Sequence, residues 1–130
     1  MTSSNELRDD LNGLRVLIVE DSWEVAASLT RLLETSGVDV IGPVATSAAA
    51  LRLIWERTVD TAVVDIHLKD GEKAYGLIDR LHDQGIRVVV ISGYSDVSVA
   101  PGKVAVILQK PMEPGLLLQS LRSGRNWKAQ

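Results

Sequence analysis

Five short apolar runs alternate with segments of helical spacing along the chain. The runs are rich in β-branched residues and occupy positions 15–19, 39–42, 61–65, 87–92 and 103–108. Three of them are continuous rather than alternating, which is typical of strands that are covered on both faces. We therefore expect five strands that lie in the middle of a layered fold.

Helical spacing marks the segments between and after these runs. Apolar residues recur every three or four positions over 25–33 and 74–81, and shorter patterns begin near Leu51 and Leu117. This alternation predicts an α/β fold, a doubly wound parallel sheet with helices on both faces. Only "GYSDVSVAPG" separates the fourth run from the fifth, so we expect the fourth helix to be shortened to a turn or two.

Composition and charge fit one small domain. The chain has 130 residues, no cysteine and a net charge of −3, which excludes disulfides and thiolate zinc sites and gives no support to nucleic-acid binding. No apolar run approaches the roughly 18 residues that a membrane span needs. We expect a polar N-terminal extension over 1–13, a folded domain over 14–123, a short tail over 124–130, and a cytoplasmic location without membrane contact.

Polar side chains follow the ends of four of the five predicted strands. These residues are Glu20, Asp21, Asp65, Ser92 and the Lys110-Pro111 pair. The carboxyl ends of parallel strands meet at one edge of a sheet, so we expect these groups to converge there. Three converging carboxylates could not all stay ionised without a cation, and an all-oxygen site suits Mg²⁺, with Mn²⁺ as a second candidate.

A divalent metal beside a lysine is the combination that stabilises a phosphoryl group during transfer. Asp65 can then act as the nucleophile and form an aspartyl phosphate. Ser92 can donate a hydrogen bond to a phosphoryl oxygen, and Lys110 can neutralise its charge. The sequence therefore predicts a phosphorylation site at this edge of the sheet.

From 14 to 121 the chain resembles a response-regulator receiver domain of bacterial two-component signalling. The acidic pair Glu20-Asp21, Asp65 in "VVDIHLKDGE", Ser92 and Lys110-Pro111 match the motifs of that family in order. The resemblance implies a flavodoxin-like strand order of 2-1-3-4-5 and phosphorylation of Asp65.

The same resemblance implies further details of the site. The metal ligands would be Glu20, Asp21, Asp65 and the backbone carbonyl of His67, and the Lys110–Pro111 peptide would be cis. The phosphodonor would be a sensor histidine kinase or a phosphotransfer protein, and a second protein would receive the output. The run "VVVISGYSD" is similar to that of stand-alone alphaproteobacterial receivers in which the fourth helix is reduced.

Two features depart from the common receiver pattern. Receivers usually carry an aromatic residue three positions before the lysine, where this chain has Ile107. The spacing from Ser92 to Lys110 is 18 residues, a few fewer than usual. Both departures concern the part of the domain that signals phosphorylation to partners.

Our leading interpretation is a single-domain response regulator that signals by protein contact or acts as a phosphate sink. It would catalyse only its own phosphorylation and dephosphorylation and would not otherwise be an enzyme. One alternative is a Mg²⁺-dependent phosphohydrolase with Asp65 as nucleophile, although its usual second acid is replaced by His67. A flavodoxin-like binder of a nucleotide or FMN is a further alternative, but the acidic "EDSWEV" is a poor phosphate loop. A degenerate receiver that serves as a scaffold also remains open.

Overall fold

The predicted strands form one parallel sheet in the computed structural model, which describes residues 11–93 and 102–124. The sheet order is β2-β1-β3-β4-β5, so the expected order 2-1-3-4-5 is confirmed. The strands are β1 (Arg15–Val19), β2 (Asp39–Val44), β3 (Thr61–Asp65), β4 (Arg87–Ser92) and β5 (Val106–Gln109).

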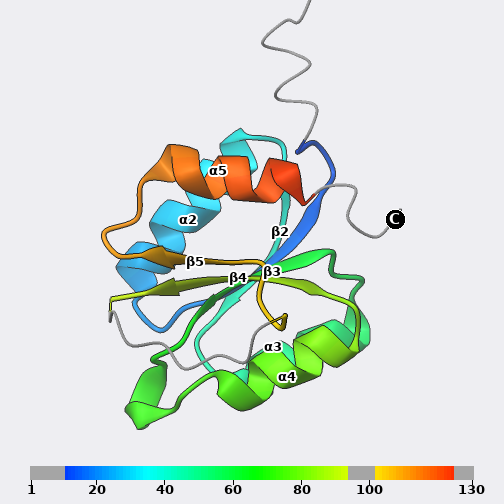
Figure 1. Cartoon of the computed structure of the whole chain (residues 1–130), viewed down its shortest axis with the longest axis vertical. Coiled ribbons are helices and arrows are strands. Elements are labelled where there is room, and N and C mark those ends of the chain that lie inside the picture. The colour runs from blue at the N-terminus through cyan, green and yellow to red at the C-terminus, as the bar shows by residue number, and fades with distance from the viewer. Residues whose placement is uncertain (1–10, 94–101, 125–130) are drawn as a thin grey trace, which may run out of the picture.

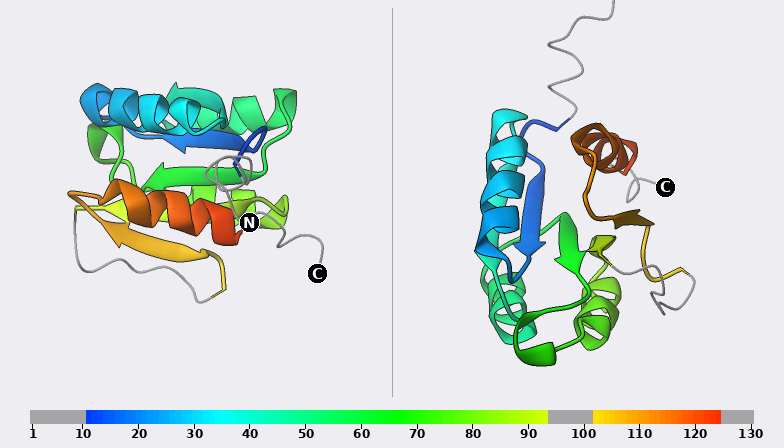
Figure 2. Two further views of the ribbon diagram at one scale, coloured as in Figure 1. Left: turned by 90° about the horizontal axis from the view of Figure 1, so that it is seen from above. Right: turned by 90° about the vertical axis from the view of Figure 1, so that its left-hand side faces the viewer.

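Helices cover both faces of this sheet (Figures 1 and 2). One face is covered by α2 (Trp23–Thr35) and α5 (Pro114–Ser123), and the other by α3 (Ser47–Glu56) and α4 (Tyr75–Asp83). A short 3₁₀ turn, η1 (Lys69–Gly71), precedes α4. The fold is therefore the doubly wound α/β fold that the alternation of runs predicted.

The sheet separates two hydrophobic cores. Along β1, Val16 and Ile18 pack toward α2 and α5, whereas Leu17 and Val19 pack toward α3 and α4. Because successive side chains of a strand point to opposite faces, a continuous apolar run such as β1 serves both cores. This explains why β1, β3 and β4 lack polar alternation.

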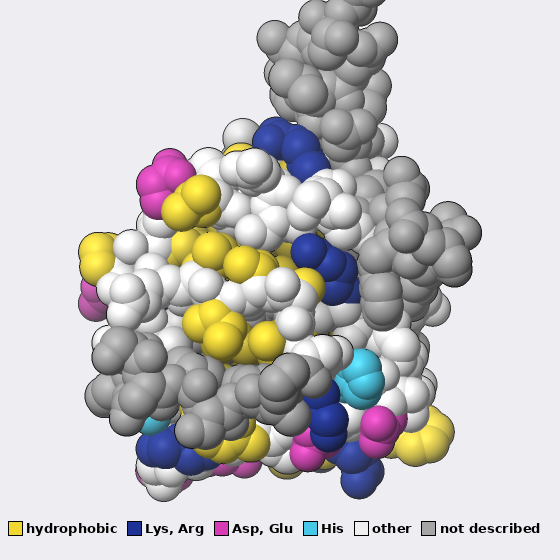
Figure 3. Space-filling model, viewed as in Figure 1, with side chains coloured by type: hydrophobic (Ala, Val, Ile, Leu, Met, Phe, Trp, Pro, Cys, Tyr) yellow, Lys and Arg dark blue, Asp and Glu magenta, His cyan; other side chains and the backbone are white. Residues whose placement is uncertain are grey.

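Strand β5 is exposed on one side and begins later than predicted. Its side chains alternate between half-buried and exposed, and hydrophobic side chains gather on the surface over β5 and α5 (Figure 3). The ammonium of Lys103 lies 2.7 Å from a carboxylate oxygen of Asp79 on α4. The first backbone bond to β4 is made by Ala105, whose N–H donates to the carbonyl of Val88. The strand therefore begins at Val106 and not at 103.

Strand β2 continues two residues beyond its predicted end. It passes through a cis Gly42–Pro43 peptide to Val44, and its pairing with β1 shifts register between Leu17 and Val19. Proline is tolerated here because β2 is an edge strand.

The folded part of the chain also includes residues 11–13, which we expected in the N-terminal extension. Leu11 is fully buried in the core under α2 and α5, and the N–H of Gly13 donates to the carbonyl of Gly37. The expected shortened helix falls on 94–101 and most of the expected tail on 125–130, both outside the described residues. No helix within the described ranges is long and apolar enough to cross a membrane.

Candidate functional site

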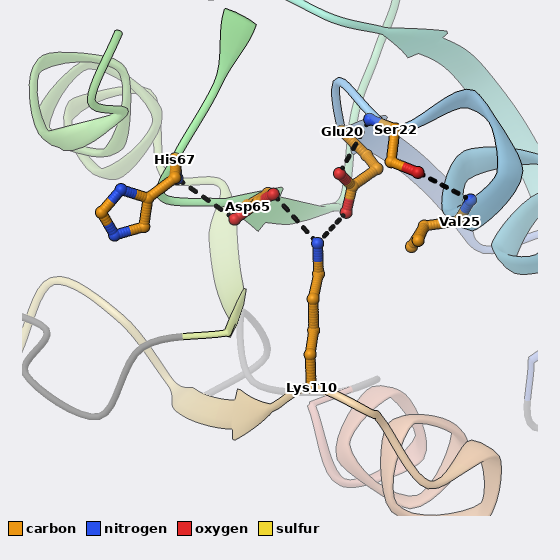
Figure 4. Close-up of polar contacts among 6 residues, drawn as sticks. All are labelled: Glu20, Ser22, Val25, Asp65, His67 and Lys110. Atoms are coloured by element: carbon orange, nitrogen blue, oxygen red, sulfur yellow. Dashed lines mark hydrogen bonds and ion pairs between the residues drawn. The ribbon is translucent and has the colours of Figure 1, made fainter. Parts of the chain in front are cut away.

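Lys110 lies between two buried carboxylates at the carboxyl edge of the sheet (Figure 4). Its Nζ is 2.9 Å from Oε1 of Glu20 and 3.1 Å from Oδ2 of Asp65. Glu20 follows β1, Asp65 ends β3, and Lys110 follows β5. The parallel sheet thus brings together three residues that are far apart in the sequence, as predicted.

Three carboxylates form one cluster at this edge. Oxygen atoms of Glu20, Asp21 and Asp65 all lie within 4.8 Å of one another. Glu20 is 2% exposed and Asp65 is 4% exposed, whereas Asp21 faces solvent. Lys110 offsets only one of the three charges, so two negative charges remain. A divalent cation with a preference for oxygen ligands would balance them, and Mg²⁺ and Mn²⁺ have this preference.

Burial and charge shift the proton affinities of this cluster. Burial raises the pKa of Glu20, and the nearby Asp65 acts in the same direction, while Lys110 opposes them. Burial acts to lower the pKa of Lys110, but its hydrogen bonds to Glu20 and Asp65 outweigh that effect, so its pKa is raised overall. Lys110 therefore remains cationic at neutral pH, and the buried Glu20 carboxylate lacks full compensation.

Backbone N–H groups orient both buried carboxylates. The N–H of Ser22 donates to Oε2 of Glu20 at 3.1 Å, and the N–H of His67 donates to Oδ1 of Asp65 at 3.1 Å. The hydroxyl of Ser22 also accepts a hydrogen bond from the N–H of Val25, which caps α2. Our reading of the sequence missed Ser22, although serine before a helix is a recognised capping signal.

The remaining predicted residues lie around this cluster. Ser92 is fully buried at the end of β4, one residue beyond Ile91, which pairs with Asp65. Its carbonyl accepts a hydrogen bond from the N–H of Lys110. The Lys110–Pro111 peptide is cis, as expected. The backbone of His67 faces Asp65, and its imidazole points away from Lys110 and the carboxylates (Figure 4).

A pocket of about 450 Å³ adjoins the site, between α2 and the loop that follows β5. Lys110 forms part of its wall, so the pocket opens beside the acidic cluster. Its other lining residues are mainly apolar: Glu24, Val25, Ser28, Leu29, Leu32, Ile91, Pro111, Met112 and Pro114. This pocket was not predictable from the sequence, because it forms between segments that are distant along the chain.

Comparisons with known proteins match this architecture. A family model described as the response regulator receiver domain matches residues 16–122. A protein-glutamate methylesterase/protein-glutamine glutaminase 3 from Hahella chejuensis (strain KCTC 2396) is 38% identical over 82 residues. That match covers 62% of this chain but 23% of the relative, so the chain spans about a quarter of that protein's length.

Solved receiver structures have the same fold. The signal receiver domain of an HD domain-containing protein from Pseudomonas fluorescens Pf-5 aligns with a TM-score of 0.81 at 22% identity, covering 91% of this chain and 98% of that one. The receiver domain of a modulated diguanylate cyclase from Desulfovibrio desulfuricans G20 aligns with a TM-score of 0.80 at 28% identity and the same coverage. Since the family model spans most of the sequence, the chain belongs to the response regulator receiver domain family.

Proposed function

We propose that this receiver domain accepts a phosphoryl group on Asp65 from the phosphohistidine of a sensor histidine kinase or a phosphotransfer protein. The observation that carries the proposal is the position of Lys110 Nζ, within 3.1 Å of Asp65 in a cluster of three carboxylates. Family membership alone supports a receiver; the intact cluster supports one that is chemically active.

The transfer follows from the groups around Asp65. A carboxylate oxygen of Asp65 attacks phosphorus, the bond from phosphorus to the histidine nitrogen breaks, and its electron pair stays on that nitrogen. Lys110 stabilises the negative charge on the phosphoryl oxygens, and the hydroxyl of Ser92 donates a hydrogen bond to one of them. The bond from the His67 N–H keeps the Asp65 carboxylate oriented before the transfer.

We propose Mg²⁺, or Mn²⁺ in its place, as the cofactor of this site. Glu20, Asp21, Asp65 and the backbone carbonyl of His67 would hold it. When bound, the metal neutralises charge on the phosphoryl oxygens. The donor set fits, because the cluster offers oxygen ligands only and has two uncompensated negative charges.

The pocket beside Lys110 is where we place the phosphodonor. Its wall is mostly apolar, and it adjoins the site without covering the exposed Asp21. A histidine-bearing helix packed against α2 and Met112 would bring its phosphohistidine close to Asp65.

We further propose that the phosphorylated domain acts in the cytoplasm, either by contact with an output protein or as a phosphate sink. It would have no enzymatic activity beyond its own phosphorylation and dephosphorylation. The methylesterase relative does not argue otherwise, because the match covers only 23% of that protein. A Mg²⁺-dependent phosphohydrolase and a degenerate scaffold are the alternatives. Labelling with acetyl phosphate distinguishes these two from an active receiver.

The test is labelling of the full chain with radioactive acetyl phosphate. We expect acid-stable, base-labile labelling that requires Mg²⁺ and disappears in Asp65→Asn, which keeps the shape but removes the attacking oxygen. A phosphohydrolase would instead turn over phosphate esters continuously, and a scaffold would not be labelled. Equal labelling of Asp65→Asn and the parent would contradict the assignment of the nucleophile.

A second variant tests the docking pocket separately from the chemistry. Met112→Asp places a charge in the apolar wall, so transfer from a phosphorylated histidine kinase should slow by at least about tenfold, whereas labelling by acetyl phosphate should persist. Loss of both reactions would show that the variant damages the site itself.

A further inference from the structure

A carboxylate in the loop that follows Asp65 binds the N-terminus of α3, the helix that lies beside α4 on the same face of the sheet. Oε1 of Glu72 accepts a hydrogen bond from the N–H of Ser47 at 3.1 Å. Ser47 is the first residue of α3, and Glu72 lies between η1 and α4. This contact joins residues that are 25 positions apart, and nothing in the alternation of runs indicated it.

The carboxylate of Glu72 compensates the N-terminus of α3, which has few other partners among the described residues. The first N–H groups of any helix lack partners within the helix, and its N-terminus carries a partial positive charge. Thr46 caps the N–H of Ala49, but the first turn of α3 contains no acidic residue. Glu72 supplies the missing negative charge from a distant part of the chain and satisfies the N–H of Ser47.

Backbone hydrogen bonds connect Glu72 to the other end of the loop, where His67 lies. The carbonyl of Glu72 accepts from the N–H of Leu68 at 2.8 Å, and its N–H donates to the carbonyl of Lys69 at 3.2 Å. The adjacent Lys73 pairs with His67 in an isolated antiparallel bridge. Fixing Glu72 therefore fixes His67 within a closed turn.

We propose that Glu72 is a positioning residue for the phosphorylation site. By anchoring the loop over 66–74 to α3, it holds the carbonyl of His67 where a metal ligand is needed and keeps the His67 N–H on Asp65. The inference rests on the proposed function, because it assigns a role in metal binding and phosphoryl transfer. It also makes the N-terminus of α3 sensitive to what is bound at Asp65.

The experiment compares Mg²⁺ binding in variants of the full chain, followed by the amide chemical shifts of the protein. In Glu72→Ala we expect the Mg²⁺ Kd to rise about tenfold, the size of effect typical for residues that orient metal ligands. Glu72→Gln keeps an oxygen that can accept the Ser47 N–H, so we expect it to recover much of the affinity. In the parent, the Ser47 amide should shift on Mg²⁺ saturation, and in Glu72→Ala it should not.

Thr46→Ala is the matched control. It removes the other cap of the same helix and should lower Tm by a comparable amount, since each variant loses one hydrogen bond to an N–H of the first turn. Within the described residues the hydroxyl of Thr46 bonds to the N–H of Ala49 and not to the loop. The Mg²⁺ Kd of Thr46→Ala should therefore equal that of the parent. If Thr46→Ala weakens Mg²⁺ as much as Glu72→Ala does, the effect comes from the stability of α3 and the inference is overturned.

The remaining outcomes are also distinct. Parent-like Mg²⁺ affinity in Glu72→Ala would overturn the positioning role while leaving the proposed function intact. A parent protein that binds no Mg²⁺ would overturn the proposed function, and the inference would fall with it.

Discussion

At the scale of the residue, the adjacent acids Glu20 and Asp21 have opposite environments. Glu20 is buried and held by Lys110 and the Ser22 N–H, while Asp21 faces solvent beside it. Both belong to the cluster that would hold the metal. We expect Asp21→Asn and Glu20→Gln each to weaken Mg²⁺ about tenfold or more, which corresponds to at least about 1.4 kcal/mol of binding free energy.

The metal-free Asp21→Asn protein should melt a few degrees above the parent, because the change relieves repulsion among the three carboxylates. Calorimetric titration with Mg²⁺ and thermal melts of the metal-free protein measure the two effects. Unchanged Mg²⁺ affinity in both variants would show that the acidic pair does not bind the metal.

Arg87 at the start of β4 is a half-buried cation. Its Nη1 is buried and makes no hydrogen bond among the described residues, and burial lowers the pKa of its guanidinium. A buried polar group that lacks a partner typically costs about 1–3 kcal/mol. Arg87→Met keeps the aliphatic stem and removes the charge, so we expect the free energy of unfolding to rise by about 1 kcal/mol and Tm by about 4 °C.

Arg31→Met, on the exposed side of α2, is the control and should leave Tm nearly unchanged. A lower Tm for Arg87→Met than for Arg31→Met would mean that the guanidinium contributes to stability where it lies, in the space that a side chain at position 124 would otherwise fill.

His67 bears on how long the phosphoryl group lasts. We expect the side chains two positions beyond Asp65 and Ser92 to shield the path of the attacking water; the second, Tyr94, lies outside the described residues. The imidazole of His67 points away from Asp65 (Figure 4), so shielding would require it to turn toward the phosphoryl group. Dephosphorylation should be faster in His67→Ala, as measured by loss of label. Slower decay would show instead that the imidazole orients the water.

At the scale of the element, the N-terminus of α2 connects the stability of a helix to the geometry of the acidic pair. The hydroxyl of Ser22 accepts from the Val25 N–H at 3.4 Å, a long bond. Ser22→Ala should therefore cost no more than about 1 kcal/mol of unfolding free energy, and Ser22→Gly only a few tenths, because glycine is tolerated at this position. Urea denaturation of both variants is the measurement. A loss in Ser22→Gly as large as that in Ser22→Ala would contradict a capping role.

The elements themselves were largely predictable from the sequence. Continuous apolar runs located β1, β3 and β4, because these strands face a core on each side. The start of β5 was not predictable, since it depends on where the chain first pairs with β4, at Ala105 and Val106. The end of β2 was misplaced because proline usually ends a strand, and whether it does so depends on which strand is at the edge.

The same distinction applies to the candidate site. Residues at strand ends were predictable because parallel strands end at one edge, which brought Glu20, Asp65 and Lys110 together. The role of Glu72 was not predictable, because its partner is the backbone N–H of Ser47. Nearly every residue has a backbone N–H, so the sequence does not show which one a side chain binds. The pocket beside Lys110 was missed for a related reason: it exists only once α2 and the loop after β5 are packed together.

At the scale of the whole molecule, the edge strand β5 is the least enclosed part of the sheet. Ile107 on β5 is 43% exposed and Leu116 on α5 is 50% exposed. Hydrophobic side chains gather on the surface over these two elements (Figure 3). Receivers usually carry an aromatic at the position of Ile107 that turns inward when the domain is phosphorylated. A β-branched side chain is stiff at χ1, so Ile107 is poorly suited to that movement.

We therefore expect the signal to leave through the segment over 93–103, most of which lies outside the described residues. It follows Ser92 directly, and it returns to the described chain at Gly102, whose φ of 89° favours glycine. We expect a rearrangement there when Ser92 and Lys110 engage the phosphoryl group. Partners would then bind this segment together with β5 and α5.

Amide chemical shifts or hydrogen exchange with and without beryllofluoride, a phosphoryl mimic, test this route. The largest changes should lie in 93–103, with a smaller change at Ser47 through Glu72. Restoring an aromatic in Ile107→Tyr should add a response within β5 that the parent lacks, because the ring has a rotamer change available. If the largest changes instead lie in α2 and α3 and 93–103 is unaffected, the signal does not leave by this segment.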